Sequence, residues 1–277
     1  SVSFPDCAAV IGLGLMGGSL AKDLSAAGSR VLGYDSHEGV AEEALSLGIL
    51  SACLDGGLEG VGEADLVILA TPVDSALEFL GRLAPLLKAG AVVTDVGSTK
   101  AAIVAAAEES GVGEVFVGSH PIAGDHRSGF KAARPGLYKG ASVYISPTST
   151  SAPAALEKVE GFWGNLGASC SRISPSEHDH LMAWVSHLPQ VVSSAVAASL
   201  ASAGWSQAQL GPGGRDVTRL AGSSPEMWTG ISMTNRNSLL TAIDDVRRRL
   251  EALEDALAKG DVDAVKAFFV TGNTWTR

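Results

Sequence analysis

Short apolar runs alternate with longer amphipathic stretches through the first half of this 277-residue chain. Continuous apolar strands that alternate with helices are typical of a parallel sheet covered by helices on both faces. The alternation therefore predicts an α/β fold. The apolar runs lie at residues 8–11, 30–34, 66–70, 92–94 and 115–117, and the amphipathic stretches lie at residues 18–27, 38–47, 74–87 and 99–109.

The pattern changes after Pro175. Before this point, a strand, a helix and a strand at residues 142–146, 153–166 and 169–173 are expected to extend the sheet. After it, helical patterns follow one another at residues 177–201, 215–221, 225–235, 238–258 and 261–269. We expect a mostly parallel sheet domain over residues 1–173 and an all-helical domain over residues 174–277, which suits the length of the chain.

The composition limits the classes of protein to which the chain can belong. Hydrophobic residues make up 46% of it and charged residues 18%, which is enough apolar content for a core. The net charge of −10 argues against a nucleic-acid partner. No signal peptide and no run of about 20 uncharged apolar residues is evident, so we expect no membrane partner. Cys7, Cys53 and Cys170 form neither a disulfide framework nor a CxxC pair, which fits the cytoplasm.

A glycine-rich segment directly follows the first apolar run. Gly12, Gly14 and Gly17 match the pattern GxGxxG in the sequence GLGLMG. Between a strand and a helix, such glycines make a tight turn, let the backbone approach a pyrophosphate and place phosphates at the positive helix N-terminus. The motif predicts a Rossmann-type dinucleotide site that includes Leu15 and Met16. The alternative is a turn that only packs the helix on the strand.

Asp35 follows the second apolar run, where a carboxylate can bind both ribose hydroxyls of a dinucleotide. A carboxylate would repel the 2′-phosphate of NADP, and residues 36–38 contain no Arg or Lys, so NAD is favoured over NADP. The alternative is that Asp35 caps the next helix. Thr71 and Pro72 follow the run at residues 66–70, so we expect them to line the same pocket.

His120 follows the run at residues 115–117, in the sequence GSHPIAG. A histidine there can accept a proton from an alcohol while a hydride leaves the same carbon, but a structural histidine is an equal alternative. We expect His37 and His178 to be solvated. We expect no metal site, because His178 and His180 lie two residues apart on a helix and their side chains diverge.

The segment at residues 177–201 is apolar almost all round and is expected to be a buried helix. His180, His187, Gln190 and Ser194 nevertheless fall on one polar stripe. Their partners are either a ligand in a pocket or an internal hydrogen-bond network. Pro189 should kink this helix.

Arg215 and Arg219 lie four residues apart at the expected start of a helix, on one face. Guanidinium groups in this arrangement suit bidentate binding of carboxylates. The alternative is that they are surface arginines paired with Asp216 or Glu226.

Six segments in a fixed order resemble the prephenate and arogenate dehydrogenases of tyrosine biosynthesis. They are GLGLMGGSLA, TDVGSTK, GSHPIAG, SHLPQ, GGRDVTRLA and SPEMW, and the resemblance extends over about residues 8–270. It implies oxidative decarboxylation of a cyclohexadienyl substrate by NAD or NADP. It also implies a nucleotide domain, a helical dimerisation domain and hence a homodimer.

The same resemblance suggests roles for single residues. His120 resembles the residue that deprotonates the ring C4 hydroxyl, and Ser98 resembles its hydrogen-bonding partner. Arg219 resembles the arginine that binds the ring carboxylate, and His187 resembles a histidine of the substrate pocket.

The chain departs from the family pattern at two places. Gln190 stands where many members have a second histidine, and Asp125 and His126 follow Gly124 where members often have Thr or Pro before an acid. Both positions could contact the substrate's side chain. The neutral Gln190 favours the ketone of prephenate, whereas Asp125 would favour the ammonium of arogenate, and we expect prephenate.

Two other hypotheses remain open. The first segment is also similar to β-hydroxyacid dehydrogenases, although their substrate motif with its helix-borne lysine is not found. The chain could also be a non-catalytic regulator that senses NAD, which His120 and Arg219 argue against. From the length we expect no fused chorismate mutase and no added regulatory domain.

Overall fold

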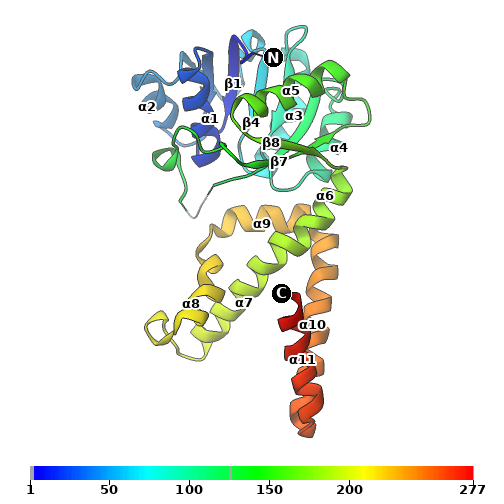
Figure 1. The fold of residues 1–277 in the computed structure, drawn as a ribbon. Helices are drawn as coiled ribbons and strands as arrows, with labels where there is room; N and C mark the ends of the chain where they lie inside the picture. The colour runs from blue at the N-terminus through cyan, green and yellow to red at the C-terminus, as the bar shows by residue number, and fades with distance from the viewer. Residues whose placement is uncertain (1–2, 125–126, 277) are drawn as a thin grey trace. The chain divides into compact units, whose positions relative to one another are not determined.

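The computed structural model describes residues 3–124 and 127–276 and divides into two compact units. Unit 1 comprises Ser1–Met182 and Gly222–Thr234, and unit 2 comprises Ala183–Ala221 and Asn235–Arg277 (Figure 1). The units therefore exchange a segment of chain, whereas the expected division was a single boundary after residue 173. That division stays a prediction about the functional domains.

Unit 1 is built on an eight-stranded sheet in the order β3-β2-β1-β4-β5-β6-β7-β8. Neighbouring strands are parallel except β6 and β7, which are antiparallel. The predicted mostly parallel α/β sheet is confirmed. The strands are β1 (Cys7–Ile11), β2 (Arg30–Tyr34), β3 (Ala52–Cys53), β4 (Leu66–Leu69), β5 (Val92–Asp95), β6 (Phe116–Ile122), β7 (Ser142–Pro147) and β8 (Ser169–Arg172). Sequence patterning missed β3, because two residues are too few to show a period.

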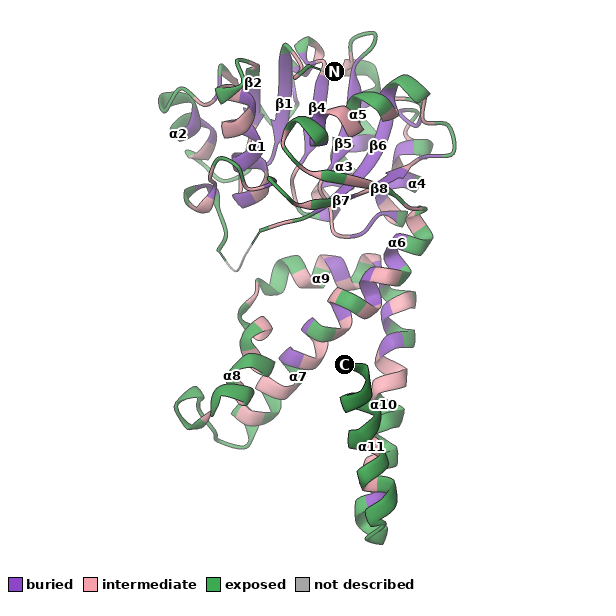
Figure 2. Cartoon of the chain, in the orientation of Figure 1, coloured by how far each residue is buried: buried purple, intermediate pink, exposed green. Residues whose placement is uncertain are grey.

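Helices cover both faces of this sheet, as β1 shows. Ala8 and Val10 belong to a core with residues of α1 and α5, whereas Ala9 and Ile11 belong to a second core with residues of α3 and α4. The central strands β1, β4 and β5 are accordingly buried, whereas the edge strand β8 is mostly exposed (Figure 2). The helices of unit 1 are α1 (Leu15–Ala26), α2 (Val40–Ser46), α3 (Val73–Leu83), α4 (Ala101–Glu109), α5 (Pro153–Asn165), α6 (Pro175–Met182) and α9 (Pro225–Thr234).

Strand β6 is longer than its sequence predicts. Its parallel neighbour β5 pairs with it only at Phe116 and Val117, but the antiparallel β7 pairs with it as far as Ile122. His120 therefore lies inside a strand, opposite Tyr144, and not after a strand end as expected. The extension depends on pairing with a distant strand, so the local sequence GSHPI does not reveal it.

Unit 2 is helical throughout its described residues. Its helices are α7 (Leu188–Ser202), α8 (Pro212–Thr218), α10 (Arg236–Lys259) and α11 (Val262–Trp275). The segment expected as one helix at residues 177–201 is divided into α6, a π-helical turn at Ala183–His187, and α7. The division falls where Pro189 predicted a kink, and Pro189 lies in the first turn of α7, where its missing N–H is tolerated.

The expectation that this segment is buried is wrong. In α7 only Gln190 and Ser193 are buried. The stretch Pro175–Ser202 has a mean hydropathy of 1.2 but only 28% of it is buried, so by length and composition it would pass as a membrane span. An apolar helix at a subunit interface passes the same test. Within the described chain, α7 packs against α8 and α10, and most of its residues remain intermediate or exposed.

Candidate active site

The glycine turn joins β1 to α1. A Cβ added to Gly12 would lie 2.6 Å from the carbonyl oxygen of Ala70, and one added to Gly17 would lie 1.8 Å from the carbonyl oxygen of Gly12. Only glycine fits at these two positions. A Cβ on Gly14 would meet nothing within 4 Å, so the turn leaves open space in front of the helix.

Helix α1 presents a positive end to that space. It begins at Leu15 with Gly14 as its N-cap, no side chain caps it, and its first turn contains no acidic residue. The first N–H groups of a helix have no partner within the helix and suit a phosphate. Tyr138 donates a hydrogen bond of 2.7 Å to the carbonyl of Met16 and so fixes the first turn.

Asp35 connects this turn to the end of β2. Its Oδ2 accepts a hydrogen bond of 2.8 Å from the N–H of Leu13, and its Oδ1 accepts one of 2.9 Å from the N–H of His37. Asp35 does not cap α2, whose N-cap is Gly39. The side chain of His37 is 83% exposed, as expected, whereas that of Asp35 is 11% exposed.

Thr71 and Pro72 follow β4 beside the glycine turn. A Cβ on Gly12 would lie 2.9 Å from the backbone nitrogen of Thr71. Thr71 Oγ1 is buried and has no hydrogen-bond partner among the described residues, and Pro72 is the N-cap of α3. An open turn, an uncapped helix and an unpartnered hydroxyl together fit a dinucleotide.

His120 belongs to a chain of three buried side chains. Its Nδ1 lies 2.8 Å from Nε2 of His178, and Nδ1 of His178 lies 2.8 Å from Oδ1 of Asp179. His178 is fully buried, and its ring packs edge to face against His120 and Tyr144. The expectation that His178 is solvated is wrong, because α6 turns this residue toward β6 and β7.

The carboxylate of Asp179 also binds backbone N–H groups at the N-terminus of α4. Its Oδ1 accepts a hydrogen bond of 2.7 Å from the N–H of Lys100, and its Oδ2 accepts one of 2.9 Å from the N–H of Ala101. Sequence reasoning missed both His178 and Asp179. One sequence signal could have identified them: a histidine and a carboxylate stand next to each other directly before the apolar part of a helix. If such polar side chains are buried, they need hydrogen-bond partners.

Ser98 is half-buried in the loop between β5 and α4. This loop is held by the buried ion pair of Lys100 and Asp95, and Asp95 also accepts hydrogen bonds from the N–H groups of Gly97 (2.9 Å) and Ser119 (3.0 Å). Burial lowers the pKa of the Lys100 ammonium, and the Asp95 carboxylate opposes this effect. A hydrogen bond between Ser98 and His120 stays a prediction.

In unit 2, polar side chains of α7 form hydrogen bonds with the backbone that follows α8. Nε2 of Gln190 donates to the carbonyl of Leu220 at 2.8 Å and approaches Oγ of Ser194 at 3.3 Å. Oγ of Ser193 accepts a hydrogen bond of 3.1 Å from the N–H of Ala221. For Gln190, therefore, at least some of the expected hydrogen-bond partners belong to an internal network. His187 is 1% exposed, and its Nδ1 lies 3.1 Å from Nδ2 of Asn235.

Arg215 lies in α8, and Arg219 begins the 3₁₀ turn that follows it. Both side chains are exposed. Within the described ranges neither forms an ion pair with Asp216 or Glu226, and Glu226 instead accepts a hydrogen bond from Ser224. The surface-pair alternative is therefore not observed among these residues.

Two further predictions concern a residue and a metal. Asp125 lies outside the described residues. Among those that the structure describes, no three His, Cys, Asp or Glu side chains gather as metal ligands.

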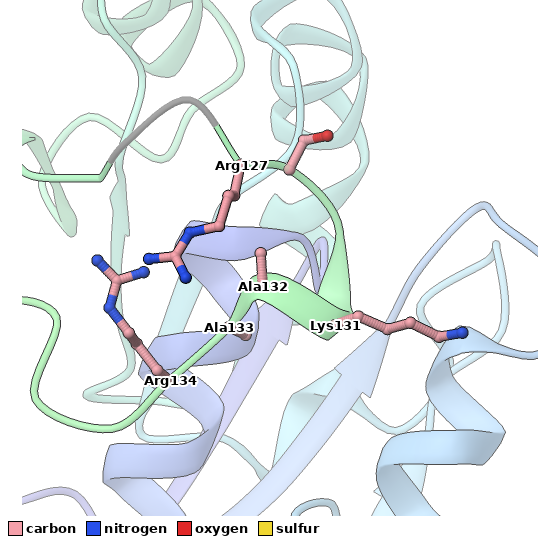
Figure 3. Close-up of a pocket in the computed structure, with 6 residues that line it drawn as sticks. Arg127, Lys131, Ala132, Ala133 and Arg134 are labelled. Atoms are coloured by element: carbon pink, nitrogen blue, oxygen red, sulfur yellow. The ribbon is translucent and has the colours of Figure 1, made fainter.

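An open cavity of about 630 Å³ lies on the connection from β6 to β7, and sequence reasoning did not single it out. Figure 3 shows Arg127 and Arg134 side by side, with Lys131 pointing away from them. The backbone of this segment is anchored to α1, because Lys22 donates to the carbonyl of Ala133 at 2.7 Å and Ser19 accepts from the N–H of Arg134 at 3.0 Å.

The chain matches two domain families. Residues 20–172 match the nucleotide-binding domain of prephenate dehydrogenase, and residues 174–271 match its dimerization domain. A prephenate dehydrogenase of Bacillus subtilis (strain 168) is 33% identical over 282 residues, which cover 98% of this chain and 75% of that protein.

Solved structures agree with these matches. A prephenate dehydrogenase from A. aeolicus, in complex with hydroxyphenyl propionate and NAD⁺, has a TM-score of 0.87 at 30% identity, with 98% of this chain and 97% of that chain covered. The arogenate dehydrogenase of Synechocystis has a TM-score of 0.80 at 30% identity, with 97% and 98% covered. Matches to both domains and to a near full-length relative show that this chain belongs to the prephenate dehydrogenase family.

Proposed function

We propose that this protein catalyses the NAD-dependent oxidative decarboxylation of prephenate to 4-hydroxyphenylpyruvate in tyrosine biosynthesis. The C4 hydroxyl loses its proton, C4 loses a hydride, and the ring carboxylate leaves as carbon dioxide, which makes the ring aromatic. NAD⁺, when bound, supplies the hydride acceptor. The observation that carries the proposal is an open dinucleotide turn after β1 in the same sheet as a buried histidine on β6.

The glycine turn and the residues around it would hold the cofactor. Gly12, Gly14 and Gly17 shape the turn, and the N–H groups at Leu15 and Met16 would bind the phosphates. The carboxylate that follows β2 would accept hydrogen bonds from a ribose. The two residues after β4, Thr71 and Pro72, would line the rest of the cofactor site.

NAD is preferred over NADP because of the charge beside the adenosine ribose. The Asp35 carboxylate is held in place by the N–H of Leu13. It repels a 2′-phosphate, and the adjacent residues 36–38 supply no Lys or Arg to neutralise one.

The remaining predicted site residues act on the substrate. His120 accepts the hydroxyl proton with Ser98 as its hydrogen-bonding partner. Arg219 binds the ring carboxylate, and its turn is held by Gln190 through the carbonyl of Leu220. We assign Arg215, His187, Gln190 and Asp125 to substrate binding as well. The domain roles follow, with the cofactor on residues 1–173 and substrate and dimer contacts on residues 174–277.

An assay of NADH formation with NAD⁺ and prephenate tests this function. Arogenate is the second candidate substrate, because one similar solved structure is an arogenate dehydrogenase. Parallel kinetics with both substrates distinguish the two activities. A kcat/KM at least about tenfold higher for arogenate than for prephenate would reverse the substrate assignment. If neither substrate yields NADH, the proposed enzymatic activity is refuted and a regulator that senses NAD is favoured.

We further propose a cytoplasmic homodimer. Exposed apolar side chains line α10 and α11, and a second copy of the chain is the partner that the matched dimerization domain suggests. They include Leu240, Leu250, Leu257, Val262, Phe269 and Trp275. The cysteines Cys7, Cys53 and Cys170 are free, which suits a reducing compartment. Light scattering at micromolar concentration that gives a single 28.2 kDa species would refute the dimer.

A further inference from the structure

Three buried side chains, His120, His178 and Asp179, link β6 to the N-terminus of α4. We propose that His178 and Asp179 are positioning residues that fix the tautomer of His120, so that its Nε2 carries the lone pair that accepts the substrate's proton. The catalytic part of this inference rests on the proposed function. The tautomer itself follows from the contacts alone.

The direction of each hydrogen bond among these three side chains follows from Asp179, the last of the three. The carboxylate of Asp179 accepts two backbone N–H bonds at the positive end of α4, so both of its oxygens act as acceptors. An ionised carboxylate can only accept, so the Nδ1 of His178 at 2.8 Å must carry a hydrogen. In a neutral imidazole the other nitrogen, Nε2, is then an acceptor.

The same reasoning continues to His120. Nε2 of His178 is an acceptor, so Nδ1 of His120 at 2.8 Å must be the donor. The hydrogen of a neutral His120 is therefore on Nδ1, and its Nε2 is left with a lone pair. This is the form in which His120 can take a proton from a hydroxyl.

His178 and Asp179 also stabilise the product of that proton transfer, the protonated ring of His120. When Nε2 takes the proton, His120 becomes a cation that still donates to His178, and the Asp179 carboxylate lies one ring further on. A buried carboxylate behind a histidine stabilises an imidazolium without itself becoming protonated. Among the described residues, Lys100 is a charged group near Asp179, and its charge is matched by Asp95.

Asp179 has a second connection, to the loop that carries Ser98. It bonds the backbone of Lys100 and Ala101, where α4 begins directly after that loop. One carboxylate thus holds both the ring of His120 and the helix that follows Ser98. We therefore expect loss of its charge to act on turnover more than on substrate affinity.

The first test variant is Asp179→Asn, which preserves shape. Oδ1 of Asp179 accepts from both the N–H of Lys100 and Nδ1 of His178, so an amide oxygen at this position can keep both bonds but carries no charge. The imidazolium that forms on His120 then loses the carboxylate that stabilises it. We expect kcat to fall by at least about tenfold with KM little changed. An unchanged kcat would overturn the proposal.

The second variant, His178→Gln, leaves the cap of α4 intact and removes the ring between Asp179 and His120. We expect kcat to fall by at least about tenfold. His180→Gln is the matched control, because it makes the same substitution on the same helix at an exposed position. Equal losses in the two glutamine variants would overturn the positioning role.

A direct readout needs no turnover. In protein labelled with ¹⁵N-histidine, NMR distinguishes protonated from unprotonated ring nitrogens, and the spectrum of His120→Asn identifies the signals of His120. We expect a protonated Nδ1 and an unprotonated Nε2 of neutral His120 in the unmodified protein. A protonated Nε2 in the neutral unmodified protein would overturn the tautomer. The expected signals without NADH formation would refute the proposed function alone.

Discussion

Nζ of Lys100 is bonded to Oδ2 of Asp95, and solvent reaches neither side chain. The two residues bracket the loop that carries Ser98. Because Asp95 also accepts N–H groups from Gly97 and Ser119, it links this loop to both β5 and β6. The geometry of the loop therefore depends on a buried charge that must remain paired.

Lys100→Met should destabilise the fold strongly. It leaves the Asp95 carboxylate buried without its cation, and breaking a buried pair on one side costs about 3–5 kcal/mol of the free energy of unfolding. Chemical denaturation measures the loss. Lys88→Met is the control, because Lys88 pairs with Asp65 at a half-exposed site where such pairs contribute about 0–1 kcal/mol. Similar losses in both variants would contradict a special role for the buried pair.

The bond between Glu160 and Arg172 should make stability depend on acid pH. Hydrogen bonds from Arg172, at 2.6 and 2.9 Å, hold the pKa of Glu160 below its usual value of 4.5. A lowered folded-state pKa stabilises the fold above about pH 4.5, and this contribution is lost as the pH falls through the folded value. Melting curves of Glu160→Gln should therefore differ from those of the unmodified protein at neutral pH and converge with them as the pH falls below the folded-state pKa of Glu160.

Asp35→Ala should weaken the preference for NAD over NADP. The substitution removes the repulsion of a 2′-phosphate and one charged hydrogen-bond acceptor for ribose, so the ratio of the two kcat/KM values should fall by about 10- to 100-fold. Asp35→Asn separates the two effects, because an amide oxygen can still accept from Leu13. Equal or better kcat/KM with NADP in the unmodified protein would disprove the assignment.

His120→Asn should lower kcat by about 100- to 10,000-fold, the usual range when a positioned proton acceptor is lost. Folding and cofactor binding should persist, because the glycine turn and Asp35 follow β1 and β2 and not β6. Circular dichroism and titration with NAD check these two properties. Near-normal turnover would exclude His120 from the mechanism.

Arg219→Ala should act mainly on substrate affinity. A lost hydrogen bond to a charged group costs about 1.5–3 kcal/mol, so KM for prephenate should rise by roughly 10- to 100-fold. Arg248→Ala, an exposed arginine on α10 that pairs with Asp244, is the comparison variant and should leave KM unchanged. If KM stays constant in both, Arg219 does not bind substrate.

The sequence predicted what depends on local pattern. The glycine turn is an example, since the crowding at Gly12 and Gly17 comes from residues that any strand, turn and helix of this kind bring together. The positions of the strands that flank it were also found, because apolar runs are continuous in a buried parallel sheet.

The parts that were missed depend on distant residues. In the sequence, His178 looks like an ordinary helical histidine that lies 58 residues from His120. The two residues meet only when α6 packs against β6 and β7. The exposure of α7 is another case, because its apolar side chains indicate burial but not whether the same chain or a second copy provides the cover.

The pairing of β6 with β7 has a consequence for engineering this enzyme. His120 stands on a backbone that hydrogen-bonds to a neighbouring strand opposite Tyr144, and not on a loop. Groups carried by strands keep their positions more precisely than groups carried by loops. New substrate specificities can therefore be sought by varying residues outside this strand pair, while His120, the residue that we propose as proton acceptor, keeps its position.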